Sequence, residues 1–507
     1  MLCLTIIFFS IFVCLYCICD CIKPRNYPPG PLWIPLFGCF LKFARLRLKH
    51  GYIYLAMQDL ERTYGPVIGL KLGVQKVVVI STYDLVKKAL LQDEFNNRPD
   101  GFFFRVRSFG KRKGVLFTEG TMWARTRRFT MRHLRTFGIG QSVMKEQLVL
   151  EAQNLIDHLQ EMSESGAVTM HTAFDVAVIN SLWFMIAGHK FELMDTMGGV
   201  VSQMPFLRFV IPELSGYEEL MEILENLWRF LDEEIKIHER KLSNDPPRDL
   251  IDAFLLEICK HDENEDTVFD RENLLVLCLD LFLAGSKTTS DTLANIFLFL
   301  SLNPEWLRVL QAELDSVVGR SRAPTEDDLP SLPITEAFLA EAQRYLILAP
   351  LGVPHTTAKD VFLNGYRIPK DTVILFDYHS AHNDKAYWER PNEFRPQRFL
   401  DEQGQFRRNN YGLPFGLGKR RCLGEQLARS TLFLFFTYVV HYFDIEISAE
   451  HSKPNLNGYD GFTVSPKPYY LKLTRRSSCD DDPHVTRAST HDGTFGLLRR
   501  GLISLNS

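Results

Sequence analysis

A glycine-rich loop near the C-terminus ends at a cysteine, and this loop has the clearest chemistry of the chain. It runs from Phe415 to Gly424, with Cys422 near its end and three cations at 419–421 just before the cysteine. Glycine allows a backbone to approach a flat and bulky group closely. An apolar-rich helix is expected over 425–440, so the helix dipole and the cations would stabilise a Cys422 thiolate. The sequence therefore predicts an anionic sulfur ligand, which suits a metal that prefers soft ligands.

Two further pairs of residues stand at helical spacing. Glu341 and Arg344 are three residues apart, and Trp123 and Arg127 are four apart, which places the members of each pair on one helix face. Taken alone, the Glu341–Arg344 pair would be an ordinary surface ion pair worth about a few tenths of a kcal/mol. A lone histidine such as His355 is usually a surface residue or a hydrogen-bonded core residue.

The composition indicates one large globular body. The 507 residues are 46% hydrophobic and 24% charged, which excludes disorder for the bulk of the chain. A net charge of -4 gives no support to a nucleic-acid binder, so no nucleic-acid partner is expected. A mean hydropathy of -0.09 excludes a polytopic membrane protein but not a single span. The ten cysteines are too unevenly spaced for a disulfide framework or a zinc site.

The N-terminal segment is apolar and is followed by a basic, proline-rich stretch. Residues 1–19 contain no charge, and as a helix they would extend about 28 Å, or about one hydrocarbon thickness. Because Lys23 and Arg25 follow, the positive-inside rule places the rest of the chain in the cytosol. A cleaved signal peptide is the rival interpretation, but a basic leader and a small-residue cleavage site are missing. We expect a single-pass transmembrane anchor over 1–22 and a hinge over 23–31.

The remaining sequence predicts a mainly α-helical body with small segregated β-sheets, an α+β class. Since no repeat or linker divides residues 32–476, one domain is expected there, and the polar tail over 477–507 is expected to be disordered. The run 77–80 predicts a strand, and Asn364–Gly365 predicts a type I′ hairpin turn. A long apolar helix is predicted over 274–302.

The loop at Cys422 resembles the haem-binding loop of the cytochrome P-450 monooxygenases. It has the pattern F-x-x-G-x-R-x-C-x-G at every fixed position, namely Phe415, Gly418, Arg420, Cys422 and Gly424. The resemblance implies that Cys422 is the thiolate ligand of a haem b iron, where it favours O–O bond cleavage. It also implies the fold of that family with an N-terminal membrane anchor helix.

Other segments resemble further motifs of this family. Glu341 and Arg344 match E-x-x-R, and Arg398 lies in an element similar to P-x-R-F. The resemblance implies that these three residues form a buried ionic network that locks the haem loop, so that removal of one member costs several kcal/mol. It also implies contacts with the haem propionates for Trp123, Arg127, His355 and Arg420.

The segment 284–290 resembles the oxygen-activating pattern A/G-G-x-D/E-T-T/S. Gly285 and the neighbouring hydroxyls predict a local widening of the helix, with room for dioxygen and water, and the resemblance makes Thr288 the hydroxyl of the proton relay. The sequence departs from the pattern at Lys287, where the family has an acid, and a solvated lysine returns its proton poorly. Lys287 could face solvent and pair with Asp291, which we favour. Otherwise the enzyme is slow or uncoupled, or its chemistry needs no second proton.

A basic stretch lies between residues 105 and 135, where ten cations accompany a single acid, Glu119. The family docks an NADPH-cytochrome reductase on a basic proximal face, so this stretch predicts that partner, with salt-sensitive binding. A solvated surface is the simplest alternative, and a nucleic-acid patch lacks regularly spaced aromatic platforms. The cations are Arg105, Arg107, Lys111, Arg112, Lys113, Arg125, Arg127, Arg128, Arg132 and Arg135.

We therefore predict a haem-thiolate monooxygenase of the endoplasmic reticulum membrane, which uses O2 and electrons from NADPH to hydroxylate or epoxidise an apolar small molecule. The resemblance is greatest to insect microsomal members, including the group with juvenile-hormone (methyl farnesoate) epoxidases, which suggests a lipid or terpenoid hormone precursor. The alternatives are a reductase-independent haem-thiolate isomerase or dehydratase, and a non-catalytic haem-binding protein. The expected substrate contacts are Phe102, Phe103, Phe104 and Ala284.

Overall fold

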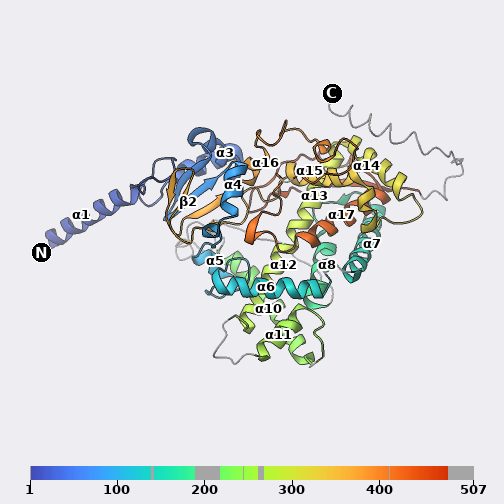
Figure 1. Cartoon of the computed structure of the whole chain (residues 1–507), viewed down its shortest axis with the longest axis horizontal. Helices are drawn as coiled ribbons and strands as arrows, with labels where there is room; N and C mark the ends of the chain where they lie inside the picture. The colour runs from blue at the N-terminus through green and yellow to red at the C-terminus, as the bar shows by residue number, and fades with distance from the viewer. Residues whose placement is uncertain are drawn as a thin grey trace.

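The computed structural model of the chain describes residues 2–138, 142–188, 217–243, 245–260, 268–409 and 411–477. Within these residues, helices form most of the body and the strands form four small, separate sheets (Figure 1). This arrangement confirms the predicted α+β class. The predicted tail over 477–507 lies outside the described residues, apart from Ser477.

Helices and strands follow one another along the whole body. The α-helices are α1 (Leu2–Cys21), α2 (Phe40–His50), α3 (Ile53–Tyr64), α4 (Tyr83–Leu90), α5 (Phe102–Val106), α6 (Gly120–Thr136), α7 (Ser142–Glu164), α8 (Asp175–Ala187), α10 (Tyr217–Lys241), α11 (Leu250–Lys260), α12 (Arg271–Gly285), α13 (Lys287–Leu302), α14 (Pro304–Val317), α15 (Pro333–Tyr345), α16 (Tyr378–His382) and α17 (Glu425–Tyr442). Short 3₁₀ helices are η1 (Asp93–Phe95), η3 (Glu326–Ser331), η4 (Pro396–Phe399) and η5 (Gly418–Arg420). The strands are β1 (Val67–Leu72), β2 (Gln75–Ile80), β3 (Val168–Thr169), β4 (His355–Thr356), β5 (Val361–Leu363), β6 (Tyr366–Ile368), β7 (Val373–Phe376), β8 (Phe443–Ile447), β9 (Gly458–Tyr459), β10 (Ser465–Pro466) and β11 (Tyr470–Arg475).

The largest sheet has the order β1-β2-β7-β4, and only its β2–β7 pair is parallel. Residues 77–80 lie in β2 and are buried, which confirms the predicted strand. A second sheet has the order β3-β11-β8, while β5–β6 and β9–β10 are two-stranded. The turn between β5 and β6 has positive φ at Asn364 (52°) and Gly365 (82°), as the predicted type I′ turn requires.

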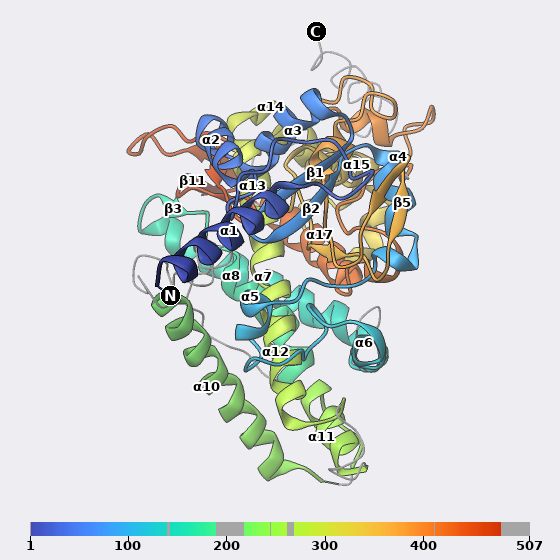
Figure 2. The same ribbon diagram turned by 90° about the vertical axis from the view of Figure 1, so that its left-hand side faces the viewer.

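Two consecutive helices, α12 and α13, run through the interior of the molecule (Figure 2), and α8 packs against both of them. The long helix predicted over 274–302 is divided into two at Ser286, where ψ is -75°, and this is the place where a local widening was expected. The Ser286 hydroxyl donates to the carbonyl oxygen of Phe282 at 2.9 Å, which gives the backbone a competing partner. A Cβ atom at Gly285 would lie 2.2 Å from Leu182 of α8, so glycine also allows the close packing of these helices.

Helix α1 projects away from the body beside the largest sheet (Figure 1), and its apolar side chains are exposed, for example Phe8 and Phe9. Among the described residues, no helix reaches the combined length and hydropathy that crossing a bilayer requires. The expected transmembrane anchor is therefore not confirmed. The last turn of α1 is fixed to the body by an ion pair between Asp20 and Lys71 of β1, whose side chain is only 5% exposed.

A buried histidine joins α10 to the start of α11. His238 Nε2 lies 3.0 Å from Asp249 Oδ2, and its Nδ1 lies 3.3 Å from Glu234 Oε1. Burial lowers the pKa of His238, but the hydrogen bonds with Asp249 and Glu234 outweigh it and raise the pKa to about 10. The imidazolium form is therefore the stable one in the folded protein at neutral pH.

This raised pKa predicts a pH-dependent contribution to stability. Because the folded pKa lies above the unfolded value of about 6.5, the contribution is complete below that pH and is lost as the pH rises toward about 10. His238→Gln should therefore lower the free energy of unfolding more at pH 6.5 than at pH 9.5. Urea unfolding of both proteins across this range measures the difference, and an equal loss at both pH values would contradict the assignment.

Candidate active site

The loop that ends at Cys422 is held by its own backbone and by the end of α4. The Cys422 N–H donates to the carbonyl oxygen of Phe415 at 2.9 Å. Gly418 has a φ of +71°, and a Cβ atom there would lie 2.2 Å from the carbonyl oxygen of Leu90, so only glycine fits. At Gly424 a Cβ atom would meet no protein atom within 4 Å. Close packing against Leu90 therefore explains why position 418 is a glycine. At Gly424 the surface beside Cys422 is open.

Cys422 lies just before α17 and is exposed. Desolvation by the surrounding protein raises the pKa of its thiol, while the Gly424 N–H and the charges of Arg127 and Arg421 lower it. The predicted stabilisation of a thiolate by cations is thus present but is outweighed. A bound metal ion would reverse this balance, since coordination deprotonates a thiol.

Three guanidinium groups, those of Arg98, Arg127 and Arg420, lie beside this loop, where the charge of Arg127 lowers the pKa of Arg98, and the charges of Arg98 and Arg127 lower the pKa of Arg420. Burial is the larger cause, and together these effects lower the pKa of Arg98 to about 9 and that of Arg420 to about 8. Backbone carbonyl oxygens hold all three: Pro354 accepts from Arg98 at 2.8 Å, Arg421 from Arg127 at 2.7 Å, and Thr118 from Arg420 at 2.6 Å.

This guanidinium cluster has more positive charge than its acidic neighbours balance. Glu119 acts on Arg420 with the opposite sign, but it is also ion-paired with Arg112 at 2.9 Å. The Nη1 atom of Arg420 is buried and has no hydrogen-bond partner among the described residues. A buried donor without a partner is costly, so the cluster suits an anionic ligand such as a carboxylate.

Trp123 and His355 border the cluster. The Arg420 guanidinium carbon lies 3.9 Å from the centroid of the Trp123 ring, and that of Arg127 lies 5.9 Å from it. His355 is buried, and its Nδ1 donates to the carbonyl oxygen of Phe95 at 2.6 Å. Burial and the charges of two arginines lower the pKa of His355 well below its usual value, so it is neutral.

The structure thus groups the predicted Trp123, Arg127, His355 and Arg420, and it adds Arg98, which we did not predict. The residues around Arg98 in the sequence do not indicate its place in the site. Its Nη1 atom donates to the carbonyl oxygens of Val353 and Pro354, which lie more than 250 positions further along the chain.

The break between α12 and α13 carries the departure from the family pattern. The Thr288 hydroxyl donates to the carbonyl oxygen of Ala284 at 2.7 Å, and Ala284 is exposed. Lys287 lies 3.4 Å from Asp291, as the favoured interpretation expects, and its side chain is 32% exposed. It also lies 3.3 Å from Asp175 of α8, a contact that the sequence did not indicate.

Glu341, Arg344 and Arg398 form a buried ionic triad below the loop. Glu341 accepts from Arg344 at 2.7 and 2.8 Å and from Arg398 at 3.2 Å, and its side chain is fully buried. Arg344 also donates to the carbonyl oxygen of His382 at 2.9 Å. The interpretation of Glu341–Arg344 as a surface pair is therefore wrong, and the network implied by the resemblance is present.

Removal of the triad's carboxylate should be strongly destabilising. Glu341→Gln leaves two cations in a buried position without a counter-charge, which should lower the free energy of unfolding by about 3–5 kcal/mol. Glu389→Gln is the matched control, because Glu389 pairs with Arg390 and Arg395 at the surface and is 75% exposed. Urea unfolding of the three proteins measures both changes, and equal effects of the two substitutions would refute a special role for the triad.

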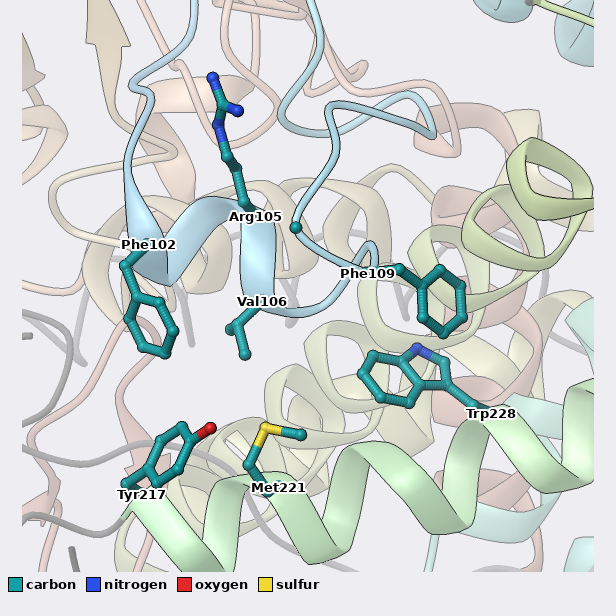
Figure 3. A pocket seen from close by; sticks show the side chains of 8 residues that line it. Phe102, Arg105, Val106, Phe109, Tyr217, Met221 and Trp228 are labelled. Atoms are coloured by element: carbon teal, nitrogen blue, oxygen red, sulfur yellow. The ribbon is translucent and has the colours of Figure 1, made fainter. Parts of the chain in front are cut away.

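A pocket of about 470 Å³ opens between α5 and α10 (Figure 3). Its walls are mainly apolar, and Phe109 packs on Trp228 with their ring centroids 4.5 Å apart. Of the predicted substrate contacts, only Phe102 lines this pocket; Phe103 and Phe104 contact each other, and Phe104 contacts Phe117. The lining residues are Phe102, Arg105, Val106, Phe109, Gly110, Tyr217, Met221 and Trp228.

The basic stretch is less cationic in the fold than the sequence suggests. At least five of its ten cations are ion-paired, and Arg107 is buried against Asp280 of α12. Asp280 also accepts from the N–H groups of Val115 and Leu116 at 2.7 and 2.9 Å, so it ties the α5–α6 connection to α12. Helix α6 also presents exposed cations, which include Arg128 and Arg132.

Comparison with known proteins identifies the class of this site. The chain matches the cytochrome P450 family over residues 28–473. It is 35% identical to the farnesoate epoxidase of Bombyx mori over 470 residues, which cover 89% of this chain and 94% of that protein. It is 34% identical to the probable cytochrome P450 305a1 of Drosophila melanogaster over 485 residues (90% and 95% coverage), and 35% identical to cytochrome P450 2J3 of Rattus norvegicus over 470 residues (89% and 91%).

The chain therefore belongs to the cytochrome P450 family, whose members are oxidoreductases that act as monooxygenases. The family implies a haem-thiolate iron cofactor, a small-molecule substrate, O2 and a redox partner. The residues present fit such a cofactor. An exposed cysteine stands beside an open glycine, and the guanidinium cluster, with its unpartnered Arg420 Nη1, suits the two carboxylates of a haem.

Proposed function

We propose that this enzyme is a haem-thiolate monooxygenase that inserts one oxygen atom of O2 into an apolar terpenoid or a related lipid, by hydroxylation or epoxidation. The observation that carries this proposal is the Cys422 loop beside the guanidinium cluster. The similarity to a farnesoate epoxidase supports the substrate class. The mainly apolar pocket at Phe102, Met221 and Trp228 suits such a substrate as well.

In this proposal the Cys422 sulfur would bind the iron of haem b, and the bound haem would supply the activation of O2. Arg98, Arg127 and Arg420 balance the propionate charges, and neutral His355 offers its Nε2 to the same region. Trp123 keeps the Arg420 guanidinium in place by stacking. Phe415, which contacts the Arg429 guanidinium, and the glycines at 418 and 424 shape the loop around the cofactor.

Thr288 is the proposed hydroxyl of the proton relay, at the position that follows Lys287 in α13. Its hydroxyl is held toward the Ala284 carbonyl oxygen, which leaves its oxygen able to accept a second hydrogen bond. Lys287 is engaged with two carboxylates, so it serves as their counter-ion in this proposal and the relay uses other groups. Glu341, Arg344 and Arg398 fix the segment that supports the loop.

We further propose that the protein acts at the endoplasmic reticulum membrane with its catalytic domain, residues 32–476, in the cytosol. The exposed apolar side chains of α1 support attachment to a membrane, and residues 23–31 would form the hinge. An NADPH-cytochrome reductase would supply the electrons after docking at α6. Arg128 and Arg132 are exposed there and would attract an acidic partner.

Turnover with purified reductase tests the proposal. The full chain in vesicles, supplied with NADPH and reductase, should oxidise methyl farnesoate and show the CO-difference spectrum of a haem thiolate after reduction. Cys422→Ser should lose both the spectrum and product formation, because a hydroxyl is a much poorer ligand for this iron. Product formation without NADPH would instead favour an isomerase. A normal thiolate spectrum in Cys422→Ser would refute the assignment of the ligand.

Charge reversal on α6 should weaken the encounter with reductase. Arg128→Glu/Arg132→Glu is expected to raise the reductase concentration needed for half-maximal turnover about tenfold at low salt, and the difference should shrink at high salt. Lys76→Glu, at an exposed position on β2, is the control and should change little. Steady-state turnover at several ionic strengths gives the comparison, and a salt-independent defect would argue against docking on α6.

A further inference from the structure

Lys287 lies between two buried carboxylates at the break between α12 and α13. Its Nζ atom lies 3.3 Å from Asp175 Oδ2 on α8 and 3.4 Å from Asp291 Oδ1, one turn further along α13. The Asp175 side chain is 9% exposed and that of Asp291 is 1% exposed. The other Asp291 oxygen accepts from the Ser465 hydroxyl of β10 at 2.6 Å. Three elements of the fold thus enclose one carboxyl group.

The charges of this group do not balance when both carboxyls are ionised. Among the described residues, two negative charges would then face one ammonium, and Asp291 is buried from water. An unpaired buried charge is expensive. Burial raises the pKa of Asp291 and the charge of Asp175 raises it further, while Ser465 and Lys287 act in the opposite direction. Asp291 Oδ1 makes no hydrogen bond among the described residues, although it faces Lys287. This is an environment that retains a proton on a carboxyl.

Asp291 also stands close to the proposed relay along the helix. It follows Thr288 by three residues and Lys287 by four, so on the helix surface Asp291 is a neighbour of each of these two residues. The Lys287 end of this face is partly exposed, while the Asp291 end is buried. A proton held at Asp291 is therefore one helical turn from the Thr288 hydroxyl.

We propose that the carboxyl of Asp291 is the proton donor to Thr288 and replaces the acid that position 287 lacks. This inference rests on the proposed role of Thr288. The Asp291 O–H bond breaks as the proton passes to the Thr288 oxygen, directly or through one water, and the Thr288 hydroxyl releases its own proton into the site. Lys287 then stabilises the Asp291 carboxylate, which a proton from bulk water restores to the neutral form. Relative to the family pattern, the proposed acid stands one helical turn further along α13, at position 291, and Lys287 is its counter-ion.

Coupling of NADPH use to product formation tests the donor. Asp291→Asn should reduce the product formed per NADPH roughly tenfold or more, because a positioned proton donor contributes 10²–10⁴-fold. Adding Lys287→Glu to Asp291→Asn restores an acid at position 287 and should recover most of the coupling. Ser465→Ala is the matched control, because it removes a hydrogen bond to Asp291 but keeps the carboxyl, and it should retain coupling.

Infrared spectroscopy gives a measurement that does not depend on turnover. The full-length holoprotein at neutral pH should show a protonated-carboxyl band that is sensitive to D2O and is absent in Asp291→Asn. If that variant fails to fold, Lys287→Met serves instead: loss of the counter-ion should move the disappearance of the band to higher pH. A band that is the same in wild type and Asp291→Asn, or that does not move in Lys287→Met, overturns the proposal.

Thr288→Ala separates failure of this inference from failure of the proposed relay. If Thr288→Ala uncouples the enzyme and Asp291→Asn does not, Thr288 acts with another donor and the inference is wrong. If neither variant uncouples the enzyme, the proposed role of Thr288 fails first and the inference fails with it. Equal losses in Ser465→Ala and Asp291→Asn would indicate a local packing effect and would also count against Asp291 as the donor.

Discussion

Repulsion among three guanidinium groups is the constraint around which the site is built. Burial and the charge of Arg127 lower the pKa of Arg98, and burial with the charges of Arg98 and Arg127 lowers that of Arg420, while Glu119 offsets this only in part. The protein tolerates this because backbone carbonyl oxygens from separate segments hold each group, and those carbonyls are fixed only when the segments are packed. This guanidinium cluster is therefore also the point where the segment before α6, the start of β4 and the Cys422 loop meet.

Buried charge is handled differently elsewhere in the same chain. The Glu341 triad and the Arg107–Asp280 pair place opposite charges in contact, so they stabilise the fold only when every member is present. One fixes the segment that supports the Cys422 loop, and the other ties the α5–α6 connection to α12. The guanidinium cluster is left with excess charge, and it faces the place where an anionic cofactor would bind. In the supports each cation contacts a carboxylate, whereas the three guanidinium groups of the site are held by backbone carbonyl oxygens.

The spacing of residues along the sequence made a large part of the fold and of the site predictable. The Cys422 loop, the pair Glu341 and Arg344, and the Asn364–Gly365 turn each depend on residues a few positions apart, so the sequence indicates them. The burial of the Glu341–Arg344 pair was implied only by the family resemblance. Arg98 and Asp175 could not be found in this way, because their partners are more than 100 positions away. The break at Ser286 was also missed as a break, since hydroxyl competition with the backbone and the approach of α8 act together there.

The ion pair between Asp20 and Lys71 makes the last turn of α1 a part of the body. Lys71 lies on β1 with its side chain almost fully buried, its Nζ atom lies 5.7 Å from the centroid of the Trp33 ring, and Asp20 also accepts from the N–H of Leu36. The end of the apolar helix therefore contacts the folded domain directly. A truncated chain that begins after residue 22 would lack the carboxylate that balances Lys71. Poor folding of such a chain would then report on a broken ion pair as much as on the loss of a membrane segment.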